Sequence, residues 1–164
     1  MTNVMYAKGW KKVYEGASGI NVLGDIRLAL VMTNTTCDTE NDSIEFLDDF
    51  TTLDEYDGTG YARLALSTAT PSFTHDTTRN SLKLVCTSHP AFPTLSGDGT
   101  RNVQGVLYYI NVLADDAQSV PLIYAPYTTP RVPDGTDFTI ELPSDKVVAE
   151  FFQAATSTTP ITND

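Results

Sequence analysis

An alternation of apolar and polar residues, with a period of two, dominates the pattern along this chain. Within Asp25–Met32 the residues Ile26, Leu28 and Leu30 fall on one face, and Tyr61–Ser67 alternates in the same way. A period of two is typical of β-strands. Five later segments are interpreted as strands on the same ground: Leu82–Thr87, Gln104–Leu113, Val120–Ala125, Asp137–Leu142 and Lys146–Phe152.

A helical period occurs near the start of the chain, over residues 4–17. Apolar residues recur there at spacings of three and four, and three lysines and a glutamate supply the polar side. Gly9 weakens the predicted helix. We expect Trp10 and Tyr14 to pack on the sheet rather than to form a binding surface.

The segment Phe46–Leu66 combines three local signals. Apolar residues on one face predict a short helical turn between Ile44 and Leu53. The sequence Asp57-Gly58-Thr59-Gly60 favours positive φ values at low cost, and an extended segment follows it. This combination of turn, glycine hinge and strand is typical of a scaffold rather than of a reaction centre.

The segments between the predicted strands are rich in turn residues, and two of them, residues 33–43 and 68–81, are expected to be loops. Pro121 lies near the start of its strand, so that strand should begin at an edge or after a bulge. About seven short strands with turns between them favour a sandwich or a jelly-roll-like barrel. We therefore predict a mainly β chain: one antiparallel β-sandwich or jelly-roll-like domain over residues 1–152, followed by an extended tail over residues 153–164.

Composition supports the β interpretation and narrows the range of partners. The chain has 24 threonines, which suit half-exposed strand positions, and a formal net charge of −11. An acidic surface repels phosphate backbones and anionic lipid, so we expect neither nucleic-acid nor membrane binding. The N-terminus lacks the pattern of a secretory signal, which favours synthesis in the cytoplasm. Cys37 and Cys86 are accordingly expected to be reduced and buried.

Residues with catalytic potential are few. His75 could be combined on paper with Asp76 or Cys86, and His89 precedes a proline, but neither histidine lies in a recognised catalytic motif. Three acidic groups offer oxygen ligands for calcium without the spacing of an EF-hand loop, namely Asp48-Asp49, Asp54–Asp57 and Asp115-Asp116. Aspartates in such turns usually bond to the local backbone. We therefore predict no catalytic, cofactor-binding or metal-binding residues, and no enzymatic activity.

Four segments together resemble a known family. They are Met5-Tyr-Ala-Lys-Gly-Trp10, Asp25-Ile-Arg-Leu-Ala-Leu-Val31, the segment from Phe46 to Arg63, and the segment from Gly105 to Tyr124. In combination they are similar to small structural proteins of tailed-phage virions, in particular the head decoration or cement proteins. The resemblance implies a non-enzymatic protein on the capsid exterior that binds the major capsid protein. A homo-oligomer is expected, with a trimer as the guess by analogy.

Two other functions stay open at this point. The first is a tail or baseplate module that recognises host surface glycans through aromatic side chains. The candidates are Tyr108, Tyr109, Tyr124 and Tyr127. Aromatic residues in strands, however, more often belong to the core. A small hydrolase would depend on His75 or His89. Counting copies per virion separates these classes, because a shell protein is abundant and a fibre or connector is not.

Overall fold

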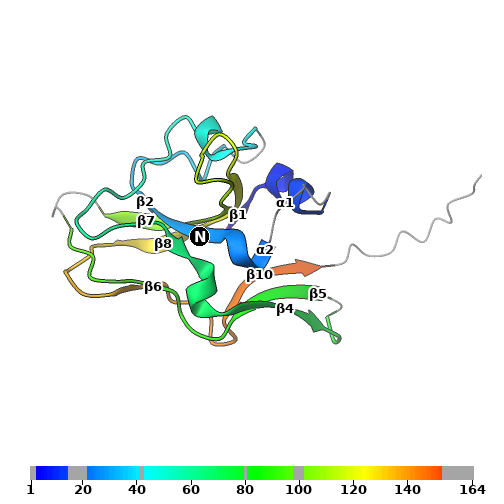
Figure 1. Cartoon of the computed structure of the whole chain (residues 1–164). Helices are drawn as coiled ribbons and strands as arrows, with labels where there is room; N and C mark the ends of the chain where they lie inside the picture. Colours follow the sequence, from blue (N-terminus) through cyan, green and yellow to red (C-terminus); the bar gives the residue numbers. More distant parts are fainter. Residues whose placement is uncertain (1–2, 15–21, 41–42, 80, 98–101, 153–164) are drawn as a thin grey trace, which may run out of the picture.

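The computed structural model describes residues 3–14, 22–40, 43–79, 81–97 and 102–152 of the chain. They form two stacked antiparallel sheets (Figure 1). The larger sheet has five strands in the order β1-β8-β7-β2-β3, and the smaller has three in the order β10-β5-β4. A short ribbon pairs β6 with β9. The prediction of a mainly β, sandwich-like fold is confirmed.

The elements have the following bounds. The strands are β1 Val4–Met5, β2 Ile26–Met32, β3 Leu64–Ala65, β4 Pro71–Asp76, β5 Ser81–Cys86, β6 Ala91–Phe92, β7 Val103–Ile110, β8 Val120–Arg131, β9 Phe138–Thr139 and β10 Val147–Phe152. The helices are α1 Ala7–Tyr14 and α2 Val22–Asp25, and two 3-10 turns are η1 Leu47–Asp49 and η2 Leu66–Ala69. The predicted tail, residues 153–164, lies outside the described residues.

The inner core fills the space between the two sheets. Leu28 and Leu30 of β2 and Tyr108 of β7 contribute from the larger sheet, and Leu84 of β5 and Val148 of β10 from the smaller one. Each is at most 8% exposed. Burying a large apolar side chain stabilises a fold by about 1.5–3 kcal/mol, so this shared core holds the sheets together.

A second core covers the opposite face of the larger sheet. Val31 and Tyr109 project from the sheet, and Cys37, Leu47 and Phe50 of the segment between β2 and β3 pack over them. In Figure 1 this segment lies above β2 and β7. The predicted loop at residues 33–43 therefore carries a fully buried cysteine. Because both faces of the larger sheet are covered, Ala29 and Val31 are buried as completely as Leu28 and Leu30.

A bulge lies directly after Pro121, within β8 rather than before its start. The register between β7 and β8 shifts there, since Tyr108 lies opposite Ile123 while Tyr109 lies opposite Pro121. The extra residue of this bulge is Leu122, which has no partner on β7, while the proline beside it lies opposite Tyr109. The strand then continues to Arg131, well past the predicted end at Ala125.

Other boundaries also differ from prediction, and the predicted strand Asp137–Leu142 is reduced to the two residues of β9. The predicted loop at residues 68–81 contains β4, whose six residues pair with β5 from Pro71↔Cys86 to Asp76↔Ser81. The predicted strand Tyr61–Ser67 is reduced to the two residues of β3, followed by a 3-10 turn. At the start of the chain, Val4–Met5 is a strand and the helix begins at Ala7, because the backbone of β1 pairs with Ile123 and Tyr124.

Helix α1 lies against β8 through its glycine. A Cβ built on Gly9 would lie 1.9 Å from the carbonyl oxygen of Pro121, which is a backbone atom. Beside it the Trp10 indole N–H donates to the Leu122 carbonyl at 3.1 Å, and the Trp10 side chain belongs to the inner core. The glycine that weakens the helix therefore permits its close approach to the sheet, and the core role predicted for Trp10 is confirmed.

We predict that Gly9→Ala destabilises the protein, although alanine is the better helix former. The steric conflict with Pro121 should lower the free energy of unfolding by about 1–3 kcal/mol, as overpacking does. Urea unfolding followed by circular dichroism measures the change. Ala7→Gly at the exposed start of α1 is the control and should cost less than about 1 kcal/mol. A stabilised Gly9→Ala variant would contradict the packing described here.

Candidate functional site: a braced loop beside Arg63

An ionic cluster at Arg63 joins two segments that are distant in the sequence. Arg63 donates from Nε and Nη2 to the Glu55 carboxylate at 2.8 and 2.6 Å, and from Nη2 to Asp116 Oδ2 at 2.8 Å. The exposed fractions of the Arg63, Glu55 and Asp116 side chains are 24%, 23% and 40%. Paired, charge-assisted contacts of this kind are short, directional and stronger than neutral hydrogen bonds.

Backbone contacts with β2 fix the position of Glu55. Met32 N–H donates to the Asp54 carbonyl at 2.8 Å and Tyr56 N–H donates to the Leu30 carbonyl at 2.9 Å, so residues 54–56 lie along β2. The Tyr61 hydroxyl donates to Glu55 Oε1 at 2.6 Å and accepts from Leu30 N–H at 3.2 Å. The Glu55 carboxylate is therefore held in place by contacts other than those with Arg63.

The turn before Arg63 depends on Gly60. Its φ is +86°, and a Cβ there would lie 2.8 Å from the Thr94 carbonyl oxygen. The predicted glycine hinge is thus confirmed at Gly60, where both the backbone conformation and the close approach exclude a side chain. Gly60 directs the chain back toward β2, three residues before Arg63.

Arg63 stays protonated within this cluster. The hydrogen bonds that it donates to Asp116 and Glu55 raise the pKa of Arg63 above its ordinary value, more than burial lowers it. The guanidinium carbon lies 5.3 Å from the centre of the Tyr109 ring, which adds a cation–π contact. Burial raises the pKa of Tyr109, so this ring stays neutral.

Asp116 lies in the loop between β7 and β8, residues 112–119, which holds two residues in an unfavourable conformation. Leu113 and Ala114 have φ values of +52° and +55°. A left-handed conformation costs a residue with a Cβ roughly 1–2 kcal/mol, so the surroundings must hold the loop in place. The Leu113 side chain is 84% exposed.

Several hydrogen bonds brace this loop. Asp115 N–H donates to the Val112 carbonyl at 3.0 Å, and Ser119 N–H donates to the Asp115 carbonyl at 2.9 Å. Leu47 N–H reaches both the Asp116 carbonyl at 3.1 Å and the Ser119 carbonyl at 3.0 Å. These bonds fix the loop internally and also attach it to the segment between β2 and β3, which covers the second core.

A hollow of about 350 Å³ lies beside the loop. It is lined by Arg27, Arg63, Tyr109, Asn111 and Ala114. The exposed Leu113 belongs to this loop and directly precedes Ala114. A fixed loop that displays a large apolar side chain next to a hollow is a feature of docking surfaces, where a preformed shape lowers the cost of binding. We take this loop, with Leu113 at its tip, as the candidate functional site.

The acidic groups considered as calcium ligands have structural partners instead. Asp49 Oδ2 accepts from Glu45 N–H at 2.8 Å and from Phe46 N–H at 2.9 Å, and these bonds lower the pKa of Asp49. Asp54 Oδ2 accepts from Asn34 N–H at 2.8 Å. Asp115 accepts from the backbone of Ala117 and the side chain of Gln118. Within the described residues, no group of three or more His, Cys, Asp or Glu side chains could hold a metal ion.

The histidines do not assemble a reaction centre with the cysteines. His75 lies opposite Leu82 on β5 and Cys86 lies opposite Pro71, so His75 and Cys86 are four positions apart along the ladder. At about 3.3 Å per residue this separates them by roughly 13 Å. His89 Nδ1 accepts from Leu142 N–H at 3.1 Å, which is a structural contact.

Both cysteines are free and buried, as expected. Burial raises the pKa of Cys37 to about 12 and that of Cys86 to about 11. A thiol with so high a pKa carries almost no thiolate at neutral pH and is a poor nucleophile. Neither cysteine therefore matches the environment of a catalytic residue.

Three of the four tyrosines considered as a glycan platform belong to the core. Tyr108, Tyr109 and Tyr124 are at most 3% exposed. Tyr127 is half-buried and packs its ring on Phe138, with centroids 6.2 Å apart. The interpretation of these strand aromatics as core residues is confirmed for the three buried ones, which cannot form an exposed sugar-binding surface.

Sequence analysis missed the role of Arg63 and Asp116. These residues are 53 positions apart, and no local pattern relates them. One feature of the sequence could have indicated the ion pair: Arg63 is the one basic residue in Phe46–Leu66, a segment with five acidic residues. An isolated cation in such a segment is a candidate for a shared ion pair.

Comparisons with protein-family models, with curated proteins and with solved structures find no match to this chain. The residues that the structure describes include no helix with the length and apolar content needed to cross a membrane.

We predict that Arg63→Ala lowers the free energy of unfolding by about 2 kcal/mol, since it leaves Glu55 and Asp116 without their cation. The partial exposure of these groups places the value below the 3–5 kcal/mol of fully buried pairs. Arg79→Ala is the control, because Arg79 is 57% exposed and pairs with Glu150 at 3.0 Å. It should change stability by about 0–1 kcal/mol. Equal losses in the two variants, measured by urea unfolding, would refute a special role for Arg63.

Proposed function

We propose that this chain is a non-enzymatic structural protein of a tailed-phage virion. In this role it decorates the outer surface of the head, binds the major capsid protein and stabilises the shell. One observation carries the proposal: two segments that resemble the decoration proteins, Phe46–Arg63 and Gly105–Tyr124, meet at the Arg63–Asp116 ion pair. The unit that they build displays Leu113, and its charged side chains are engaged in holding the loop.

The physical requirements of a cement protein agree with this unit. Such a protein stabilises a shell because it binds the assembled state and not the separated subunits. A rigid loop loses little conformational freedom on docking, so more of the contact energy appears as affinity. Burying Leu113 in a capsid surface would contribute about 1.5–3 kcal/mol per contact. Repeated over many copies, a modest contact of this size is sufficient to stabilise the shell.

The charge of the chain suits a partner with a basic surface. A formal net charge of −11 favours approach to basic patches and disfavours contact with packaged DNA. We propose that the protein acts as a homo-oligomer on a local symmetry axis of the head, with a trimer as the arrangement suggested by analogy. Its place is then the capsid exterior, after synthesis in the host cytoplasm.

The test is rebinding of the purified protein to phage heads that lack it, measured by cosedimentation. We expect saturation at hundreds of copies per head, and at least tenfold weaker binding for Leu113→Ser with unchanged thermal stability. Val132→Ser is the matched control, since Val132 is also exposed (55%) but lies outside the 112–119 loop. Failure to bind heads, or only a handful of copies per virion, would contradict the proposal.

A further inference from the structure

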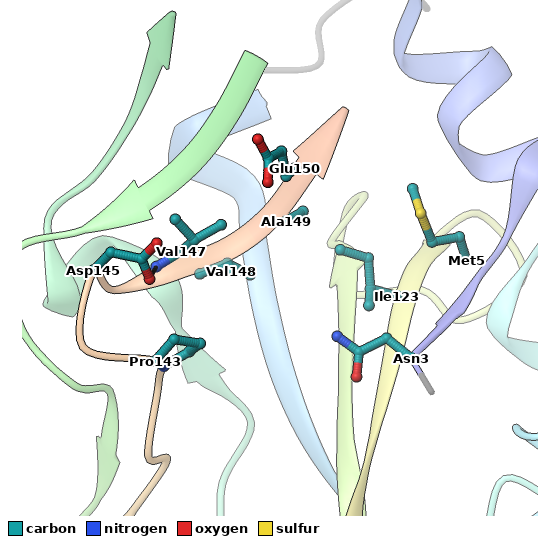
Figure 2. Close-up of a pocket in the computed structure, with 9 residues that line it drawn as sticks. All are labelled: Asn3, Met5, Ile123, Pro143, Asp145, Val147, Val148, Ala149 and Glu150. Atoms are coloured by element: carbon teal, nitrogen blue, oxygen red, sulfur yellow. Dashed lines mark hydrogen bonds between the residues drawn. The ribbon is translucent and has the colours of Figure 1, made fainter. Parts of the chain in front are cut away.

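The two sheets differ in width, since the larger has five strands and the smaller has three. Strand β1 is an edge strand of the larger sheet, and β10 is an edge strand of the smaller one. A hollow of about 370 Å³ lies between these two strands, and Figure 2 shows Val148 and Ala149 of β10 on one side of it, with Ile123 and Met5 on the other. The hollow occupies the place where a fourth strand of the smaller sheet would lie.

The outer edge of β10 is available for pairing. Among the described residues, β10 pairs with β5 along one edge, from Val147↔Val85 to Phe152↔Ser81, and no strand pairs with its other edge. An unpaired edge presents a row of backbone donors and acceptors that can accept a further strand. With six residues, β10 is long enough to hold one.

The floor of the hollow is apolar, with Ile123 buried and Met5 exposed. Met5 and Ile123 are direct partners across β1 and β8, on the face turned toward the inner core. Tyr6 N–H donates to the Leu122 carbonyl at 3.1 Å, so Met5 and Ile123 form a non-hydrogen-bonded pair, in which side chains lie close together. Met5 is nevertheless 44% exposed, which is unusual for a large apolar residue beside a core.

A second hollow of about 230 Å³ continues the first. The two share Asn3, Pro143, Val147 and Val148 in their linings. The continuation follows the segment that leads into β10, so the two hollows form one groove along the edge of the sandwich. A groove of this shape suits an extended chain better than a compact ligand.

The rim of the groove is acidic. Its lining includes the carboxylates of Glu141, Asp145 and Glu150, and no lysine or arginine. Glu150 already pairs with Arg79 and Lys83, whereas Glu141 and Asp145 form no ion pair with the residues that the structure describes. An occupant with basic residues would match this rim, and the formal net charge of −11 would favour its approach.

We propose that this groove binds an extended, basic segment of a partner protein, which pairs with the outer edge of β10 as a fourth strand. Apolar side chains of the segment cover Met5, and the intervening lysines or arginines face the acidic rim. Binding of this kind takes affinity from main-chain hydrogen bonds and specificity from alternate side chains. The groove is a different surface from the 112–119 loop, so this inference does not depend on the proposed function.

The probe is an acetylated and amidated nine-residue peptide that alternates valine with lysine and threonine. We expect it to shift the amide resonances of β10 and of Met5 and Ile123 in a two-dimensional NMR titration. A peptide with glutamate in place of lysine, and one with proline at two paired positions, should each bind at least tenfold more weakly. Equal binding of all three peptides, or shifts confined to other surfaces, would overturn the proposal.

Matched variants separate this groove from the loop. Met5→Asp should weaken binding of the basic peptide at least fivefold, because it places a charge on the apolar floor. Leu113→Asp introduces the same charge on the 112–119 loop and should leave peptide binding unchanged. The amide spectra of both variants are recorded to verify that they are folded. If Met5→Asp instead abolishes a concentration-dependent self-association of the free protein, the occupant is a second copy of this chain and the proposal is wrong.

Discussion

The Arg63 guanidinium is a central cross-link between the sheet and the segments that cover its outer face. It connects Glu55, which is fixed to β2 by the backbone of its neighbours, with Asp116 in the β7–β8 loop. Without this cation two carboxylates would face each other across the edge of the sheet. Arg63 thus removes the repulsion between the two carboxylates and holds the 112–119 loop and the segment around Glu55 together beside Tyr109.

The strained loop is a consequence of this cross-link. Leu113 and Ala114 take left-handed conformations because Asp116 and Ser119 are held by Arg63 and by the Leu47 amide. Their cost is offset by contacts elsewhere, as is common where a surface is shaped for binding. The groove on the opposite side has another origin, namely the unequal number of strands in the two sheets. One molecule therefore offers two separate surfaces, one made by a rigid loop and one by an unpaired edge.

Sequence reasoning succeeded where local chemistry decides the structure. The central strands β2 and β7 and the turn at Gly60 follow from hydrophobic pattern and backbone preference. It failed where pairing alone makes a strand. Strand β4 is largely polar and exposed, and it is extended because β5 pairs with it.

The length of β8 illustrates the same limit. Pro126 lies opposite Gly105 within this strand, although prolines usually end a strand. Beyond Tyr124 no described strand pairs with β8 on the side of β1, so a missing N–H has no consequence there. Asp49 and Asp115 bond to the local backbone as expected, whereas Asp54 bonds to Asn34, 20 residues away. The pairing of Arg63 with Asp116 could not be predicted, because it depends on the folded arrangement of two distant segments.

Native-state hydrogen exchange at the Leu47 amide tests most directly whether the outer layer is locked to the sheet. This amide bonds to the Asp116 and Ser119 carbonyls, so it reports on the braced loop and on the covering segment at once. The account predicts that Leu47 exchanges with the same free energy of opening as the amides of β2 and β7, in a single cooperative unit. An opening free energy several kcal/mol below that of the central strands would contradict it, and would show that the outer layer detaches by itself.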